Sequence, residues 1–353
     1  MLGCLILVVT AMRVGLYDHQ AFREHDSGAG HPERPERLDA VRRGIRKAGL
    51  EPRLQLLTPR AATRDELRAV HTAGHIGRLA ATAGQTTRFD PDTQAGPHSY
   101  GAALLAAGSV VDAVDRVLVG DLDRAFCAVR PPGHHAEADR AMGFCLFNNV
   151  AVGAARALES GLHRVAVVDF DVHHGNGTQQ IFYDDSRVLY VSSHAYPFYP
   201  GTGSLDEVGK GKGLGFSVNL PLPVTMGDAE YSRIYREIVV PVVCSFDPEL
   251  VLVSAGFDPH RDDPLAGMAA TERGFAAMAA SCLAAASGSA KGRAVFVLEG
   301  GYDLDGIAES TAAVMRVLLG ETVETGGDSA PRIDPLIGVF RKHHGQYWPS
   351  LAR

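Results

Sequence analysis

The segment Asp169-Phe-Asp-Val-His-His-Gly-Asn-Gly-Thr178 directly follows the apolar run Val165-Ala-Val-Val168. Such a run, bounded by turn residues, is typical of a strand buried on both faces of a parallel sheet. Because alternate residues of a strand point to the same face, Asp171 and His173 can converge on one atom. A carboxylate and an imidazole are common ligands of divalent metals, and zinc is the leading candidate. The segment therefore predicts part of a metal site at the carboxyl end of a strand.

Two other interpretations of this segment stay open when it is considered alone. Two carboxylates after an apolar strand also hold magnesium in phosphotransfer enzymes, which would use Asp169 and Asp171. An aspartate and a histidine near a strand end can also form an ordinary hydrogen-bonded pair. Other segments of the chain must decide between these hypotheses.

Composition limits the classes of protein to consider. The chain has 353 residues, of which 46% are hydrophobic, enough for a large core in one or two domains. A net charge of -7 gives no basic patch, so nothing supports direct nucleic-acid binding. The five cysteines lie far apart and resemble buried core residues of a reducing compartment, which predicts a cytoplasmic protein.

The first residues, 1–11, are apolar but too short to span a bilayer and lack a basic export-signal region. We expect them to be an N-terminal extension of uncertain status, with an export signal as the open alternative. A single domain is expected to cover 12–353, without membrane attachment.

Short apolar runs alternate with helical patterns along the whole chain, as in α/β proteins. The expected strands are 13–17, 125–129, 164–170, 188–192, 250–254 and 294–298. The expected helices are 34–48, 64–83, 100–119, 149–161, 228–243, 271–286 and 304–319. Loops at the carboxyl ends of parallel strands share one edge of the sheet, so the polar segments after these strands can meet there.

A further carboxylate follows the run Val251-Leu-Val-Ser-Ala-Gly-Phe-Asp258. With Asp171 and His173, Asp258 would give zinc three protein ligands and leave a position open, as in catalytic zinc sites. The alternative is that Asp258 is a helix N-cap or forms an Asx-turn before Pro259.

A histidine pair ends the segment Arg130-Pro-Pro-Gly-His-His135. The two prolines and the glycine fix the loop, which favours a positioned acid/base role for His134 and His135. Asp169 is placed to orient one imidazole and raise its basicity. Asn176 could orient the other without adding charge, so we expect that imidazole to keep a pKa near 6.5 and act as general base.

Tyr302 follows a double glycine in Leu298-Glu-Gly-Gly-Tyr302. Its hydroxyl could donate to a developing oxyanion, although a packed loop aromatic is the alternative. The sequence contains no G-x-S-x-G elbow and no phosphate-binding glycine loop. Together these residues suggest metal-assisted hydrolysis of an amide or ester.

From about Arg13 to Trp348 the chain resembles the histone deacetylase superfamily, closest to its class II and bacterial amidohydrolase branch. The resemblance rests on ordered motifs: His31-Pro-Glu-Arg-Pro-Glu-Arg37, Arg130–His135, Gly143-Phe-Cys-Leu-Phe-Asn-Asn149, Asp169–Thr178, Pro200-Gly-Thr-Gly203, Ser254–Asp258, Asp263-Pro-Leu265 and Glu299-Gly-Gly-Tyr302. It implies an arginase-like three-layer α/β sandwich with a central, mostly parallel sheet, in a single domain.

The resemblance also implies roles for the residues that the sequence singled out. It makes Asp171, His173 and Asp258 the ligands of one catalytic zinc. It makes His135 the general base, with His134 as its electrostatic partner, and Tyr302 the residue that polarises the acyl carbonyl. Asp169 and Asn176 match the residues that orient the histidine pair.

Further positions are implied for the substrate and for a second ion. Gly143, Phe144 and Tyr199 match the channel for the acyl-lysine side chain, and Tyr199 replaces the more usual phenylalanine. Arg37 matches an arginine of the internal cavity through which acetate leaves. Relatives also bind potassium, which would involve Asp169, Asp171, His173 and Ser192.

Substrate preference is expected from Leu265, because polyamine-preferring relatives have an acidic residue there. An apolar rim would attract a second amine little, so acyl-lysine of a peptide or protein is the favoured substrate. The alternatives are an acetylpolyamine or another small acetylated amine, and more remotely a catalytically silent acyl-lysine binder.

Overall fold

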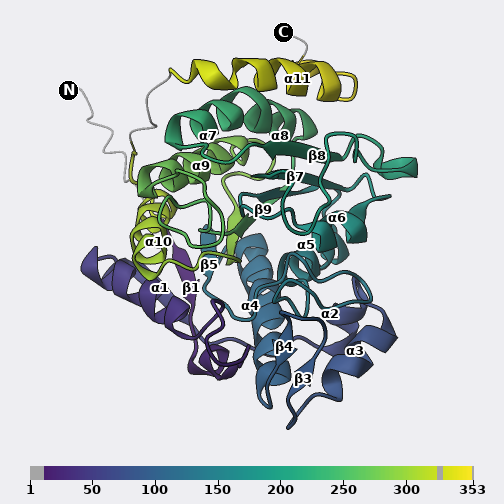
Figure 1. Ribbon diagram of the computed structural model, residues 1–353, viewed down its shortest axis with the longest axis vertical. Coiled ribbons are helices and arrows are strands. Elements are labelled where there is room, and N and C mark those ends of the chain that lie inside the picture. Colours follow the sequence, from purple (N-terminus) through teal and green to yellow (C-terminus); the bar gives the residue numbers. More distant parts are fainter. Residues whose placement is uncertain (1–11, 324–328, 352–353) are drawn as a thin grey trace, which may run out of the picture.

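The computed structural model describes residues 12–323 and 329–351 and contains a central eight-stranded sheet (Figure 1). The strand order is β2-β1-β5-β10-β9-β6-β7-β8, and each neighbouring pair is parallel. The strands are β1 (Val14–Tyr17), β2 (Leu54–Leu57), β5 (Arg124–Cys127), β6 (Val165–Asp169), β7 (Val188–Ala195), β8 (Ser217–Leu222), β9 (Leu250–Ala255) and β10 (Ala294–Leu298). The expected α/β fold with a parallel sheet is confirmed.

Helices cover both faces of this sheet and complete three layers (Figure 1). On one face α10 packs against α1 and α9, and α9 packs against α7 and α8; α4 and α5 pack together on the other face. The helices are α1 (Glu36–Lys47), α2 (Arg64–Arg68), α3 (Ala73–Ala80), α4 (Ser99–Val119), α5 (Asn149–Glu159), α6 (Asn176–Phe182), α7 (Asp228–Ile234), α8 (Val240–Phe246), α9 (Glu272–Ala285), α10 (Leu304–Leu318) and α11 (Asp334–His344).

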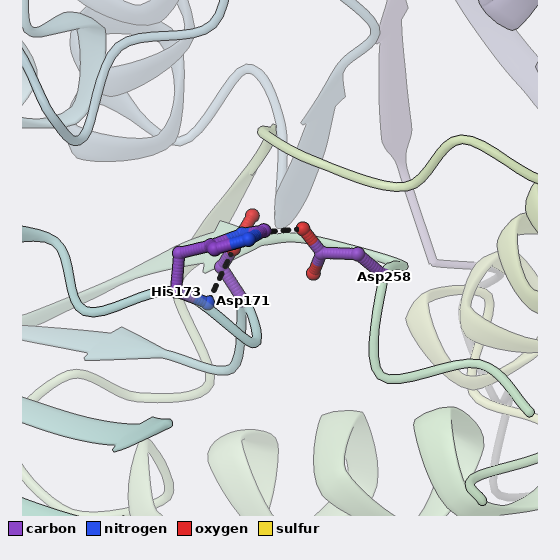
Figure 2. Close-up of side chains that lie close together, drawn as sticks. All are labelled: Asp171, His173 and Asp258. Atoms are coloured by element: carbon purple, nitrogen blue, oxygen red, sulfur yellow. Dashed lines mark hydrogen bonds and ion pairs between the residues drawn. The ribbon is translucent and has the colours of Figure 1, made fainter. Parts of the chain in front are cut away.

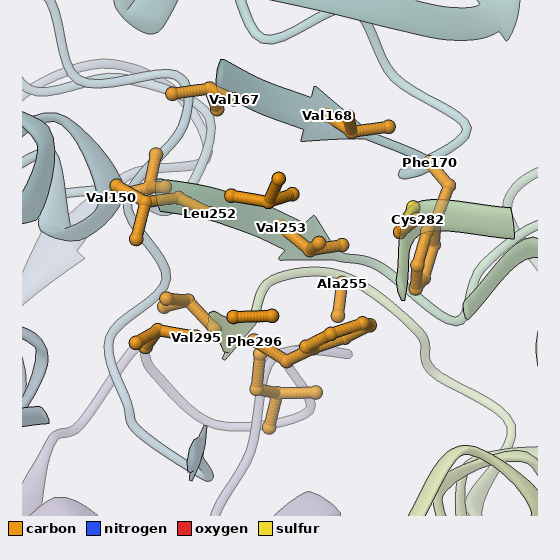
Figure 3. Packing of buried hydrophobic residues seen from close by; sticks show 14 of the residues in the cluster. Val150, Val167, Val168, Phe170, Leu252, Val253, Ala255, Cys282, Val295 and Phe296 are labelled. Carbon is orange, nitrogen blue, oxygen red and sulfur yellow. The ribbon is translucent and has the colours of Figure 1, made fainter. Parts of the chain in front are cut away.

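The core lies around the middle strands, whose apolar side chains are buried on both faces of the sheet (Figure 3). Val167 and Val168 of β6 lie beside Leu252 and Val253 of β9. Fully burying such a side chain contributes roughly 1.5–3 kcal/mol each. Because β-branched residues also fit the pleated backbone, these runs form a rigid platform for the loops that follow them.

Several elements differ from the sequence prediction. The edge strands β2 and β8 were missed, because β2 is short and half-exposed and β8 contains Pro221, which only an edge strand tolerates. The predicted helix 64–83 is two helices, since Thr72 accepts a hydrogen bond from the backbone of His75 and starts α3 anew. A two-stranded hairpin of β3 (Thr87–Arg88) and β4 (Gln94–Ala95) was also missed.

The carboxyl-terminal part packs along the β8 edge. Trp348 is buried, and its indole nitrogen donates to the carbonyl of Gly215 at 2.9 Å. Within 12–323 and 329–351 no helix is long and apolar enough to cross a membrane. The expected N-terminal extension, 1–11, lies outside the described residues.

Candidate active site

Four segments that carry chemically active residues meet at the carboxyl edge of the sheet. They follow β5, β10, β9 and β6, which are neighbours in that order. The histidine pair follows β5, Tyr302 follows β10, Asp258 follows β9, and Asp171 and His173 follow β6. The strand order therefore brings together residues that are far apart in the sequence.

Asp171, His173 and Asp258 form a buried cluster in which each side chain offers one ligand atom, all within 4.8 Å of one another (Figure 2). Nδ1 of His173 lies 3.1 Å from Oδ1 of Asp171 and 3.0 Å from Oδ2 of Asp258. The backbone N–H of Gly300 donates to Asp171 at 2.8 Å. A Cβ at Gly300 would collide with the Asp258 carboxylate, so only glycine permits this approach.

The cluster concentrates charge in a buried space. Burial and the neighbouring Asp171 raise the pKa of Asp258 to about 7. Burial alone would lower the pKa of His173, but Asp171 and Asp258 outweigh it and raise that pKa to about 10. Protons here partly neutralise two adjacent carboxylates, a task that a divalent cation performs better.

The histidine pair lies beside this cluster, and the centres of its two rings are 4.0 Å apart. Nδ1 of His134 lies 3.0 Å from Oδ2 of Asp169, and Nδ1 of His135 lies 2.8 Å from Oδ1 of Asn176. Burial opposes protonation of His134, but Asp169 and Asp171 raise its pKa to about 10.

The expectation that the Asn176-paired histidine keeps an ordinary pKa is wrong. Burial lowers the pKa of His135 well below the usual value, and the nearby His134 and His173 lower it further. Burial of the ring is the main reason, and charge on the two neighbouring rings adds to it; the sequence could define neither. His135 is therefore neutral at pH 7 next to a protonated His134.

Tyr302 closes the site from the β10 side. Burial raises the pKa of its hydroxyl well above the usual value, so the phenol stays protonated and can donate a hydrogen bond. The buried guanidinium of Arg37 lies 5.1 Å from the centre of the Tyr302 ring, and its Nε donates to the carbonyl of Gly301 at 2.6 Å. Arg37 therefore contacts both the ring and the backbone that carries it.

A cavity of about 280 Å³ leads from the surface to these residues. It is lined by Asp92, His135, Gly143, Phe144, His173, Phe198, Tyr199, Leu265 and Tyr302. Gly143 and Phe144 have positive φ angles of 56° and 69° in a tight turn between Met142 and Cys145. This turn presents the Phe144 ring edge-on to Tyr302, with the ring centres 5.9 Å apart.

Two lining residues were missed in the sequence. Phe198 stacks on His173 with ring centres 5.5 Å apart, and the aromatic run that also contains Tyr199 was the available signal. Asp92 lies between β3 and β4, the hairpin that was not predicted. The expectation of an apolar rim without a carboxylate is therefore wrong, because Asp92 lines the same cavity as Leu265. Burial and the adjacent Asp90 raise the pKa of Asp92.

The residues expected around a second ion also lie together. Ser192 of β7 pairs with Asp169 of β6, two residues before Asp171. Oγ of Ser192 lies 2.9 Å from Nδ1 of His194, and both side chains are buried.

Comparison with known proteins agrees with this geometry. Residues 31–318 match the family described as the histone deacetylase domain. The chain belongs to the histone deacetylase family. The family resemblance predicted from the sequence motifs is thus confirmed, and membership supports a deacetylase or related amidohydrolase.

Individual relatives of this family are found in archaea, plants and animals. The chain is 41% identical over 297 residues to a probable deacetylase of Archaeoglobus fulgidus, covering 84% of this chain and 83% of that protein. It is 42% identical to Histone deacetylase 15 of Arabidopsis thaliana and 42% identical to Polyamine deacetylase HDAC10 of Homo sapiens, covering 91% of this chain in both cases. The chain spans only 59% and 50% of those two proteins.

A solved structure shares the fold of this histone deacetylase family member. The crystal structure of the HDA15 HD domain superposes with a TM-score of 0.90 at 38% identity, over 97% of this chain and 96% of that one.

Proposed function

We propose that the protein is a zinc-dependent deacylase that hydrolyses the amide of N-acetyl-lysine, or of a related acylated amine, and releases acetate. The observation that carries this proposal is the convergence of three elements on one cavity: the ligand cluster of Asp171, His173 and Asp258, the neutral His135, and the phenol of Tyr302. Membership of the histone deacetylase family supports the same reaction class.

The three cluster residues suit zinc in their chemistry. Two carboxylates and one imidazole form a buried donor set, and the cavity gives solvent and substrate access to His173. When bound, the zinc would supply Lewis acidity to the acyl carbonyl and to the attacking water. Magnesium held by Asp169 and Asp171 has less support, because Asp169 is occupied by His134, Tyr190 and the backbone of Asp171.

His135 is proposed as the general base. Its pKa is lowered, so the ring is neutral at pH 7, and Asn176 occupies Nδ1, leaving Nε2 to take a proton from water. The same nitrogen can then return the proton to the departing amine. His134, protonated beside Asp169, contributes positive charge near the reacting centre without accepting that proton.

Tyr302 is proposed to stabilise the charge that develops on the acyl oxygen. Its hydroxyl remains protonated, and its ring lines the cavity beside Phe144. A hydrogen bond that strengthens as the oxyanion forms lowers the barrier rather than merely tightening substrate binding. Phe144 and Tyr199 would flank the aliphatic part of the acylated side chain, and the internal position of Arg37 suits passage of acetate.

The substrate class is the finer part of the proposal. Leu265 favours acyl-lysine of a peptide or protein, since it places an apolar side chain at the mouth. Asp92 supports an acetylpolyamine as the second candidate, because a carboxylate there can attract a distant amine. A silent acyl-lysine binder has less support, since the ligand cluster, His135 and Tyr302 are all in place.

Potassium and a cytoplasmic location complete the proposal. Asp169 and Ser192 are paired on the adjacent strands β6 and β7, and Asp171 and His173 lie in the segment that follows β6. Their oxygen atoms would suit a hard monovalent cation. Cys127, Cys145 and Cys282 are free and buried, as expected, whereas Cys244 is free and exposed, so the expectation that it is a core residue is wrong. Free thiols are typical of a reducing compartment.

The experiment that tests the proposal measures acetate release from acetyl-lysine peptides, longer acyl-lysines and acetylpolyamines at equal concentrations. We expect turnover with at least one class and inhibition by hydroxamates. A purified, folded, zinc-loaded protein that releases no acetate from any of them would overturn it.

A further inference from the structure

Glu299 is a buried carboxylate close to the site that has no part in the proposed reaction. It directly follows β10, and it is not among the residues that line the substrate cavity. Its Oε2 accepts hydrogen bonds from the backbone N–H groups of Gly133 at 2.7 Å and His134 at 3.1 Å. The hydroxyl of Ser254 donates to its Oε1 at 3.3 Å. Burying a carboxylate is costly, so these contacts indicate a specific purpose.

The backbone around Glu299 contacts the other half of the site. Its carbonyl accepts a hydrogen bond from Arg37, whose Nε donates to the carbonyl of Gly301 at 2.6 Å. The same guanidinium lies over the ring of Tyr302. The turn that begins at Glu299 therefore has two kinds of contact. The Glu299 side chain binds the backbone of the histidine loop, and its main-chain carbonyl binds Arg37, which also holds the backbone just before Tyr302.

The other end of the histidine loop is fixed by a second buried carboxylate, that of Glu33. Arg130 begins this loop and donates through Nη2 to Oε2 of Glu33 at 2.7 Å. Nη1 of Arg37 donates to Oε1 of the same Glu33 at 3.0 Å. The side chains of Glu33, Arg37 and Arg130 have no exposed surface. A continuous buried network thus joins the loop that carries His135 to the loop that carries Tyr302.

We propose that Glu299 is a positioning residue for deacylation, whose hydrogen bonds to Gly133 and His134 hold His135 in register with Tyr302. The inference rests on the proposed function, because that function has both side chains act on the same acyl group. Displacing a reacting group by about 1 Å can lower the rate about 10²-fold. Hydrogen bonds that fix the backbone directly before His135 should therefore affect the rate.

Glutamine separates geometry from charge at this position. In Glu299→Gln the amide oxygen can accept from both backbone N–H groups, and the NH₂ group can donate to Ser254. Glu299→Asp keeps the charge but withdraws the carboxylate by one methylene, and Glu299→Met keeps the shape but removes both acceptors. Burial raises the pKa of Glu299 to about 7, so its charge is incomplete at neutral pH.

Glu249 provides a matched control at the opposite edge of the sheet. Its Oε2 also accepts from two successive backbone N–H groups, those of His163 at 2.7 Å and Arg164 at 3.1 Å. It lies next to the amino ends of β6 and β9, away from the cavity. Glu249→Met therefore removes an equivalent pair of hydrogen bonds, to His163 and Arg164, at a place that does not contact the histidine loop.

The test compares kcat, KM and melting temperature for these variants on whichever acyl substrate the wild type turns over. We expect Glu299→Met and Glu299→Asp to lower kcat about 10²-fold with KM within about threefold, and Glu299→Gln to stay within about fivefold of wild type. Glu249→Met should keep the wild-type kcat even where it lowers the melting temperature.

Either of two results overturns the positioning role: a wild-type kcat in folded Glu299→Asp, or a Glu299→Gln variant as slow as Glu299→Asp. The comparison of Glu299→Asp with Glu299→Gln tests the positioning role even when Glu299→Met does not fold. If the reaction required the charge of Glu299 and not its geometry, Glu299→Asp would be faster than Glu299→Gln. A zinc-loaded wild type without any acetate release overturns the proposed function itself, whereas an active wild type with indifferent Glu299 variants overturns only the positioning role.

Discussion

Oδ1 of Asn176 lies 2.8 Å from Nδ1 of His135. The other contacts of the Asn176 amide group determine that its oxygen, and not its nitrogen, faces the ring. The NH₂ group donates to Oε1 of Glu137 at 2.8 Å, so the oxygen faces the ring and accepts its proton. Nε2 of His135 is therefore the unprotonated nitrogen.

Replacing Asn176 with aspartate should move the pH dependence of the reaction. A carboxylate next to His135 stabilises the imidazolium and raises the pKa of His135 from its lowered value. A base must be unprotonated to act, so the acid limb of the kcat/KM profile should shift to higher pH. An unchanged profile for Asn176→Asp would argue against His135 as the base.

Tyr302→Phe should lower kcat by about 10² to 10³ with little change in KM, because the hydroxyl acts mainly on charge that develops in the transition state. Tyr199→Phe is the matched control, since it removes a hydroxyl from the same cavity at a half-exposed position. Steady-state kinetics with equal metal content in both variants provides the measurement. Equal effects of the two substitutions would remove the special role of Tyr302.

Asp92 and Leu265 should control substrate charge preference in opposite ways. Asp92→Asn removes the rim carboxylate and should lower kcat/KM for acetylpolyamines more than for a neutral acetyl-lysine peptide. Leu265→Glu adds a carboxylate at the mouth and should raise the same ratio. The ratio of kcat/KM between the two substrates is the measurement, and a ratio that neither variant changes would exclude the rim from substrate selection.

His344 should make folding stability sensitive to mild acid. Burial lowers its pKa to about 4, and its Nε2 lies 3.0 Å from the carbonyl oxygen of Asn219. Because the unfolded chain takes up this proton near pH 6.5 and the folded chain does not, stability is lost as the pH falls below 6.5. The loss between pH 7.5 and 5.5 is about 1.4 kcal/mol for one such group.

His344→Gln isolates that contribution, since glutamine can still donate to Asn219 but does not titrate. Urea unfolding at the two pH values should show a smaller fall in the free energy of unfolding for the variant than for the wild type. Identical falls would mean that His344 is protonated in the folded state.

The sequence was sufficient to predict the site residues that lie close together after one strand. Asp171 and His173 are two residues apart on the extension of β6, so strand geometry alone pairs them. Asp258 and Tyr302 could be added because each follows its own apolar run, and such ends share an edge. The resemblance to a known family then supplied the roles that spacing left open.

What the sequence could not supply depends on strand order and on weakly patterned loops. Glu299 contacts His134 because β10 lies next to β5, and apolar runs of similar composition do not reveal their neighbours. Asp92 was not predicted as a cavity residue, because the strands of its hairpin have only two residues each and leave no sequence pattern. The lowered pKa of His135 comes mainly from burial and further from two neighbouring histidine rings, and only the folded chain defines both.

Metal removal tests the central claim most directly. The protein should contain about one zinc per chain, lose acetate release when a chelator strips the metal, and regain it when zinc is restored. Asp258→Ala should bind zinc poorly and stay inactive, with its fold checked by circular dichroism. Undiminished acetate release by the metal-free protein, or by Asp258→Ala, would contradict a zinc-dependent deacylase at this site.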